Sequence, residues 1–62
     1  MSIGKKLQEL RGEKSRREIA LALGVSESAY TKYERDERRP RDSLKQKIAR
    51  YYGTTVESIF FT

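Results

Sequence analysis

Basic side chains are the residues of this sequence best suited to binding chemistry. The 62 residues include 14 Lys and Arg against 9 Asp and Glu, which gives a net charge of +5. The stretch Arg35–Pro40 is polar, rich in arginine and ends in proline, so it is predicted to form a basic loop. This charge balance favours a polyanionic partner, of which nucleic acid is the commonest. Charge alone fits a merely soluble basic surface equally well.

Several other kinds of chemistry are disfavoured by residues that the sequence lacks. It contains no Cys and no His, which excludes disulfides and the usual zinc ligand sets. Catalysis would depend on carboxylates, Lys or Tyr, and no pair of these lies in an apolar stretch that suggests a pocket. We therefore expect no enzyme activity, no metal, no cofactor and no small-molecule ligand.

Nothing in the sequence resembles a targeting or membrane segment. Residues Met1–Lys6 lead directly into a charged amphipathic stretch, which is unlike a signal peptide. No apolar run approaches the ~20 residues needed to cross a bilayer. We expect a cytoplasmic protein without membrane contact.

Apolar residues recur at helical spacing along the chain and predict short helices rather than strands. A first helix carries Ile3, Leu7 and Leu10 on one stripe, after Ser2 as its N-cap and before Gly12. A second helix begins at a capping box and ends at Gly24. The capping box is formed by Ser15 and Glu18, and the apolar residues behind it are Ile19, Ala20 and Leu23.

Three further helices are predicted after Gly24. Ser26 caps the third helix, Asp42 or Ser43 caps the fourth, and Thr55 begins a short fifth. Their inward-facing residues are Tyr30 and Tyr33 in the third helix, Leu44, Ile48, Ala49 and Tyr52 in the fourth, and Val56 and Ile59 in the fifth. The sequence therefore predicts an all-α fold, with five helices in a single domain over residues 1–62.

The two helices on either side of Gly24 have the features of a helix-turn-helix unit. Ala20 is small where the two helices must approach, Gly24 suits a left-handed turn, and Val25 follows as an apolar plug. Any pair of packed helices can use these residues in the same way, so the motif needs support from its surroundings.

That support comes from a series of short motifs at fixed spacing. In order they are Glu18-Ile19-Ala20, Leu23-Gly24-Val25-Ser26, Tyr33-Glu34 and Arg39-Pro40-Arg41. Over essentially its whole length the chain resembles the lambda-repressor/Cro-like (Xre-type) family of helix-turn-helix transcriptional regulators, in particular small stand-alone members of phage or mobile-element type. The resemblance implies a DNA-binding homodimer that reads a palindromic operator in double-stranded DNA through its third helix. We expect a repressor, although the sequence leaves repression and activation open.

The resemblance also implies which residues read the bases. The matching positions are Glu27, Ser28 and Lys32, with Thr31 beside them. Lys32 can donate to guanine O6 and N7, and Glu27 can accept from cytosine N4. A favourable charge at the helix N-terminus is an equally good explanation of Glu27.

Phosphate contacts are implied for a second set of residues. Arg16 stands where the family has a phosphate-contacting glutamine, and it can hold phosphate by charge. The residues around the loop proline contact phosphates or the minor groove in the family, and Lys45 can add a further phosphate contact. The corresponding loop residues here are Arg38, Arg39 and Arg41.

Two pairs of residues have implied roles away from the DNA. Arg11 and Glu34 match positions that pair in the family, and we expect a partly exposed ion pair worth about 1 kcal/mol that orients the third helix. Phe60 and Phe61 provide more aromatic surface than so small a core can hide. They are therefore predicted to form the dimer interface, while Ile59 remains in the core.

The chain departs from the family pattern at three places. The connection Gly12-Glu13-Lys14 is about two residues shorter than the commonest version, Asp36 replaces a glycine, and tyrosines occupy core positions 30 and 33.

Two other functions use the same features. An antitoxin or anti-repressor would use this fold to bind protein, but the basic residues are retained and no toxin-binding tail follows the fifth helix. An RNA-binding module would need stacking aromatic residues, and the basic stretch has none.

Overall fold

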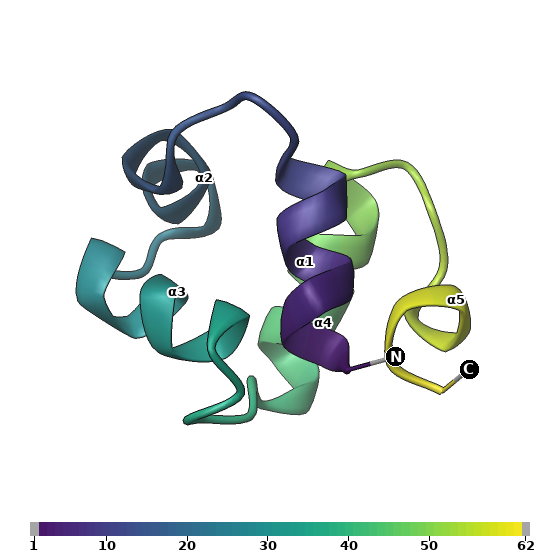
Figure 1. Cartoon of the computed structure of the whole chain (residues 1–62). Coiled ribbons are helices and arrows are strands. Elements are labelled where there is room, and N and C mark those ends of the chain that lie inside the picture. Colours follow the sequence, from purple (N-terminus) through teal and green to yellow (C-terminus); the bar gives the residue numbers. More distant parts are fainter. Residues whose placement is uncertain (1, 62) are drawn as a thin grey trace.

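The computed structural model describes residues 2–61, and Met1 and Thr62 lie outside the described part. Five α-helices make up its regular structure (Figure 1), as the sequence predicts. They are α1 (Ile3–Arg11), α2 (Arg16–Leu23), α3 (Glu27–Glu34), α4 (Asp42–Tyr51) and α5 (Val56–Phe60). The arrangement agrees with the all-α fold that the sequence predicts.

Four of the five helices begin at the predicted cap. In each, a hydroxyl oxygen accepts a hydrogen bond from the backbone amide three residues later, which satisfies one free donor of the first turn. The caps are Ser2, Ser15, Ser26 and Thr55.

The start of α4 differs from the prediction. Its N-cap is Arg41, which makes no side-chain capping bond, and Asp42 is already the first helical residue. Arg41 follows the buried Pro40 and is extended, with φ −72° and ψ 165°. The helix therefore begins directly after the proline, where Asp42 supplies a favourable charge instead of a cap.

One core holds the helices together. In Figure 1, α2 and α3 form one end of the molecule and α5 the other, with α1 and α4 between them. Helix α3 packs against α1 and α2, α4 packs against α2 and α5, and α1 also contacts α5. The buried apolar residues are Leu7, Ile19, Ala20, Leu23, Tyr30, Tyr33, Leu44, Ile48, Ala49, Ile59 and Phe60.

The turn between α2 and α3 depends on Gly24. Its backbone is left-handed, with φ 75° and ψ 29°, a conformation that costs other residues energy. The Val25 amide then donates to the Ala20 carbonyl at 3.0 Å, which closes the end of α2. This turn sets the direction in which α3 leaves α2.

Asp36 ends α3 in the same conformation without being a glycine. Its φ is 59°, and its carboxylate Oδ1 accepts a hydrogen bond from the Gly4 amide at 2.9 Å. Gly4 lies in the first turn of α1, where amides lack partners within the helix. This tertiary bond offsets the cost of the left-handed backbone and gives a physical reason for aspartate at a position where the family usually has glycine.

Candidate DNA interface

The solvent-facing side of α3 carries all four residues predicted to read bases. Glu27, Ser28, Thr31 and Lys32 line one open hollow, together with Arg35 and Glu37. This surface, which we call the α3 hollow, lies opposite Tyr30 and Tyr33, which are buried in the core. The split between an apolar inner face and a polar outer face is the one that the helical period predicts.

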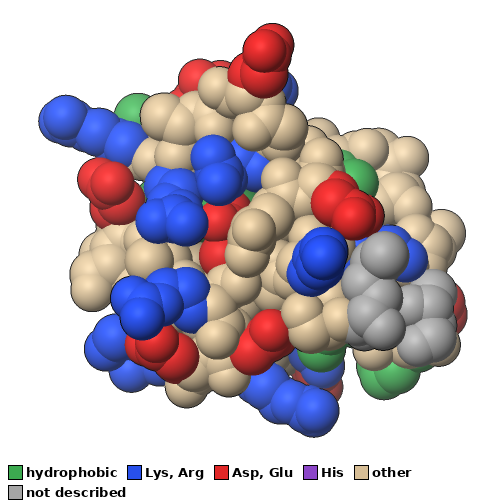
Figure 2. All heavy atoms as spheres, in the orientation of Figure 1, with side chains coloured by type: hydrophobic (Ala, Val, Ile, Leu, Met, Phe, Trp, Pro, Cys, Tyr) green, Lys and Arg blue, Asp and Glu red, His purple; other side chains and the backbone are tan. Residues whose placement is uncertain are grey.

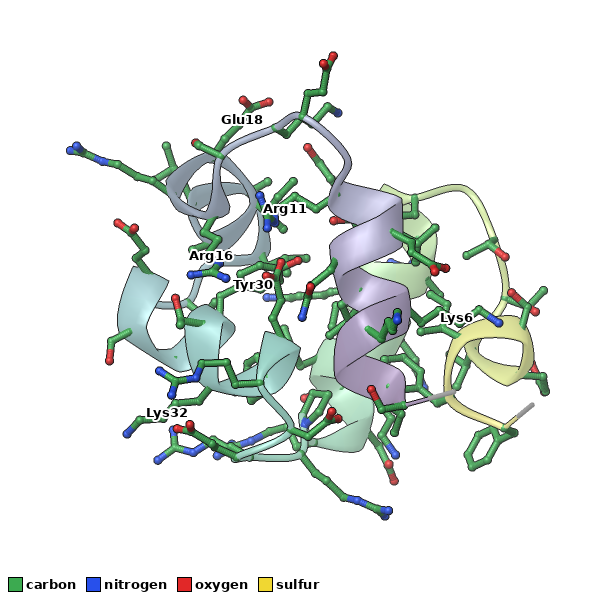
Figure 3. All side chains as sticks on the ribbon, viewed as in Figure 1. Lys6, Arg11, Arg16, Glu18, Tyr30 and Lys32 are labelled. Atoms are coloured by element: carbon green, nitrogen blue, oxygen red, sulfur yellow. The ribbon has the colours of Figure 1, made fainter. Side chains whose placement is uncertain are left out.

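The side chains of the α3 hollow differ in the hydrogen bonds that they can still make. The Thr31 hydroxyl donates to the Glu27 carbonyl at 2.8 Å, so it has acceptor capacity and a methyl group left for a partner. Lys32 is exposed and points away from the other helices (Figure 3). Glu27 lies in the first turn of α3, where its charge is favourable.

Arg35 and Glu37 were not among the predicted site residues. Arg35 Nε lies 3.1 Å from Glu37 Oε2, and both side chains are largely exposed. A sequence signal for Arg35 existed, since it lies four residues after Thr31 and seven after Ser28, which is the spacing of one helix face. Glu37 lies beyond the end of α3, so helical spacing does not predict its place in the hollow.

Glu34 is the charged residue at the centre of the α1–α2–α3 junction, and its carboxylate is fully buried. Arg11 Nε donates to Oε2 at 2.6 Å, and Arg16 Nε donates to Oε1 at 3.0 Å. Figure 3 shows Arg11 and Arg16 pointing into the same space above Tyr30. The expected pair of Arg11 and Glu34 is present, but it is more buried than the sequence suggested and includes a second arginine.

Charge pairing changes the ionisation of this cluster. Burial by itself raises the pKa of Glu34, but the hydrogen bonds and positive charge of Arg11, together with the hydrogen bond from Arg16, outweigh it and hold that pKa below its ordinary value. The Glu34 carboxylate in turn raises the pKa of Arg11. Burial raises the pKa of Tyr30, whose hydroxyl has no well-formed hydrogen bond among the described residues. Glu34 is therefore ionised in the folded protein at neutral pH.

Two more contacts join the end of α3 to α1, and a third joins α1 to the loop that follows it. Gln8 Nε2 donates to the Glu34 carbonyl at 3.0 Å, and Arg11 Nη1 donates to the Lys14 carbonyl at 2.8 Å. Gly4 packs so closely against the end of α3 that an added Cβ atom would lie 2.3 Å from the Glu34 carbonyl oxygen. The orientation of α3 is therefore set by α1.

Arg16, at the start of α2, contacts both the buried Glu34 and solvent. One edge of its guanidinium is bound to Glu34, while the side chain remains 40% exposed. An arginine has five N–H donors, so the Nη groups remain able to bind phosphate. The predicted phosphate contact is compatible with this placement, although the ion pair was not predicted.

The three loop arginines are exposed and border two different hollows. Arg38 and Arg39 border a hollow with Ser2, Ile3 and Asp36. Arg41 borders a different hollow beside the α2–α3 turn, together with Lys47. Pro40, which separates them, is buried.

Lys45 does not stand free at the start of α4 as expected. Its Nζ lies 5.4 Å from the ring centre of Phe60 and 5.5 Å from that of Phe61, and only 16% of the side chain is exposed. Nζ is also 3.8 Å from Asp42 Oδ1. The ammonium group is engaged with α5, so the structure does not support the phosphate contact expected of Lys45.

The two C-terminal phenylalanines have different environments. Phe60 is 8% exposed and belongs to the core, whereas Phe61 is 68% exposed. The expectation that both lie at the surface was wrong for Phe60, because α5 turns that ring inward beside Ile59. Phe61 borders a hollow formed with α4 and α5 residues, here called the α4–α5 hollow. Its lining is Asp42, Lys45, Gln46, Val56, Glu57 and Phe61.

Charges of both signs mix over the visible α2–α3 end of the molecule. Figure 2 shows Lys and Arg side chains gathered there and along the lower edge, with acidic groups between them.

Over the described residues, no helix is long and apolar enough to cross a membrane.

Together, the turn at Gly24, the exposed face of α3 and the surrounding arginines define a helix-turn-helix protein. A family model described as helix-turn-helix matches residues 7–59. The chain belongs to this family, of the Cro/C1 or Xre-like type, and its domain is that of a DNA-binding transcription regulator. Comparison with curated proteins and with solved structures gives no match.

Proposed function

We propose that this protein is a sequence-specific repressor that binds a palindromic operator as a homodimer, with α3 in the major groove. The α3 hollow carries the proposal, because Glu27, Ser28, Thr31 and Lys32 meet there on an exposed helix face. These side chains have the donors and acceptors that base edges in the major groove require. We further propose that the protein acts in the cytoplasm.

Each of the four proposed base-reading residues has a distinct role. Lys32 donates to guanine O6 and N7, and Glu27 accepts from cytosine N4. The Thr31 hydroxyl already donates within α3, so Thr31 offers its methyl group to thymine or accepts from a base amino group. Ser28 is small enough to permit close approach of the helix to the groove.

Phosphate contacts from outside the hollow would position α3 in the groove. We assign this role to Arg16, through its Nη groups, and to the exposed Arg38, Arg39 and Arg41. Arg38 and Arg39 border one hollow and Arg41 another, so they would reach different phosphates. Such contacts set register and affinity and carry no sequence information.

Selection of binding sites from a random duplex library tests the proposal directly. The expected result is an enriched two-fold symmetric sequence with half-sites about one helical turn (~34 Å) apart. A library that shows no enrichment would contradict the repressor function and favour a protein-interaction role, such as that of an antitoxin or anti-repressor.

Replacing Lys32 by alanine tests the assignment of the reading face. Because Lys32 is exposed and outside the core, the variant should fold normally, as circular dichroism can verify. It should lose roughly 1–3 kcal/mol on the selected site and relax the preference at one base pair. Random DNA should be affected much less. An equal loss on specific and random DNA would reduce Lys32 to a phosphate contact and refute the assignment.

Replacing Phe61 by aspartate tests the dimer. The exposed Phe61 ring beside the α4–α5 hollow is the apolar surface that we assign to the two-fold interface. Phe61→Asp should shift the protein toward monomer in sedimentation and weaken operator binding, with little effect on the fold. Leu21→Asp is the matched control, because Leu21 is 82% exposed on α2 and its loss should not change the oligomeric state. A wild-type protein that sediments as a monomer, both free and on DNA, would rule the dimer out.

A further inference from the structure

The α3 hollow contains a carboxylate that its proposed role does not explain. A surface that approaches phosphates gains affinity from positive charge, yet Glu37 lies in the hollow beside Arg35. Glu27, the other acid there, has a structural role in the first turn of α3. Glu37 lies beyond the end of the helix and has no such role.

The fold brings Glu37 back toward α3 through the left-handed turn at Asp36. With Asp36 at φ 59°, the chain reverses and the Glu37 amide donates to the Lys32 carbonyl at 2.9 Å. The Glu37 side chain then lies beside Arg35, with 3.1 Å between Glu37 Oε2 and Arg35 Nε. Asp36 is itself held by its bond to the Gly4 amide. The position of this carboxylate is therefore set by the tertiary structure of the α3 end.

We propose that Glu37 limits affinity for DNA, because its carboxylate competes with DNA phosphates for the guanidinium of Arg35. The inference rests on the proposed DNA-binding function and adds Arg35 to the interface. Carboxylate and phosphate are bound by the same planar donor edge of arginine, so a donor held by Glu37 is not free for phosphate. The side chains of Arg35 and Glu37 are 63% and 46% exposed, so their ion pair contributes little free energy. A phosphate can therefore replace the carboxylate.

The competition lowers affinity for random DNA and for the operator alike. A phosphate contact carries no sequence information, so losing one weakens both by a similar factor. Operator binding also includes base contacts from Lys32 and its neighbours, which Glu37 leaves unchanged. Glu37 therefore lowers affinity for all DNA without changing the ratio of specific to non-specific binding.

Salt titrations of binding to a random-sequence duplex test this inference with Glu37→Gln, Arg35→Ala and the double variant. Glu37→Gln should raise affinity for random DNA about two- to fivefold per protomer, because it frees Arg35 from an exposed ion pair. It should also steepen the slope of log affinity against log salt, by up to about 0.9 per protomer. Arg35→Ala should make the slope shallower. In the Arg35→Ala background, Glu37→Gln should have little further effect.

Glu9→Gln is the matched control, because it makes the same change in net charge at an exposed position on α1 outside the hollow. Equal effects of Glu9→Gln and Glu37→Gln would show that only net charge matters and would overturn the inference. So would an effect of Glu37→Gln that is the same with and without Arg35, or one that is confined to operator DNA. If the wild-type protein bound no duplex, the proposed function would fail and this inference with it. In every other outcome the wild-type protein still binds duplex DNA. The effect of Glu37→Gln then tests the role of Glu37 without testing the proposed function.

Discussion

Gly4→Ala is expected to destabilise the protein by about 3 kcal/mol, at the upper end of the usual cost of overpacking. The added Cβ atom would lie 2.3 Å from the Glu34 carbonyl oxygen, 2.7 Å from its carbonyl carbon and 3.0 Å from Asp36 Oδ2. The two nearest atoms are backbone, so α1 and the end of α3 must move apart to admit it. In an isolated helix the same change would be favourable by about 1 kcal/mol, because alanine is the best helix former.

Urea unfolding monitored by circular dichroism measures this loss, and Gly12→Ala serves as the comparison. Gly12 has a left-handed backbone with φ 59°, but a Cβ atom there meets no atom within 4 Å. Gly12→Ala should therefore reduce stability through backbone strain alone and leave the operator affinity of the folded protein unchanged. Gly4→Ala should lower that affinity as well, because it displaces α3, the helix that we propose reads the operator. A Gly4→Ala variant as stable as the wild type would contradict the close packing of α1 on α3.

Glu34→Ala is the second change with a large expected effect. Removing a buried carboxylate from its arginine partners typically costs 3–5 kcal/mol. We expect about 3 kcal/mol here, because the side chains of Arg11 and Arg16 are 20% and 40% exposed and remain partly hydrated. The loss should appear as a lower urea midpoint. Glu9→Ala, on an exposed part of α1, is the control and should change stability little. Equal stabilities of Glu34→Ala and Glu9→Ala would show that the cluster contributes nothing to stability.

The same carboxylate predicts the direction of the pH dependence. The pKa of Glu34 in the folded protein is lowered from its ordinary value of 4.5. Its stabilising contribution is therefore fully present above that value and is lost as the pH falls through the lower, folded-state pKa. The wild-type protein should lose more stability between neutral and acid pH than Glu34→Gln, which cannot titrate at this position. Parallel pH profiles for the two proteins would contradict this role of Glu34.

The sequence determined the helices of this protein and their inward faces through local effects. Serine or threonine before a helical period was enough to predict four starts, since a cap bonds an amide only three residues away. The buried faces of Tyr30 and Tyr33 followed from the 3.6-residue period. The polar outer face of α3, to which we assign base reading, was predicted for the same reason, because it is the opposite side of the same helix.

Residues whose roles depend on contacts between helices were not predictable in this way. Arg16 was assigned to phosphate alone, although it also binds the buried Glu34, which is 18 positions away in the chain. Lys45 and Phe60 were assigned to the surface, although α4 and α5 pack so that the ammonium group lies over the ring of Phe60. These roles depend on how two helices approach each other, and periodicity within one helix contains no information on that.

The end of α3 shows most clearly what only the tertiary structure decided. Asp36 was recognised in the sequence as a departure from glycine, but its bond to the Gly4 amide exists only because α1 lies against α3. The close packing of α1 on α3 also requires that Gly4 have no side chain. The left-handed turn at Asp36 brings the Glu37 side chain beside Arg35. Spacing along the chain determines which residues share a helix face. The distance between faces, and therefore which charges meet, is determined by the packing of side chains in the core.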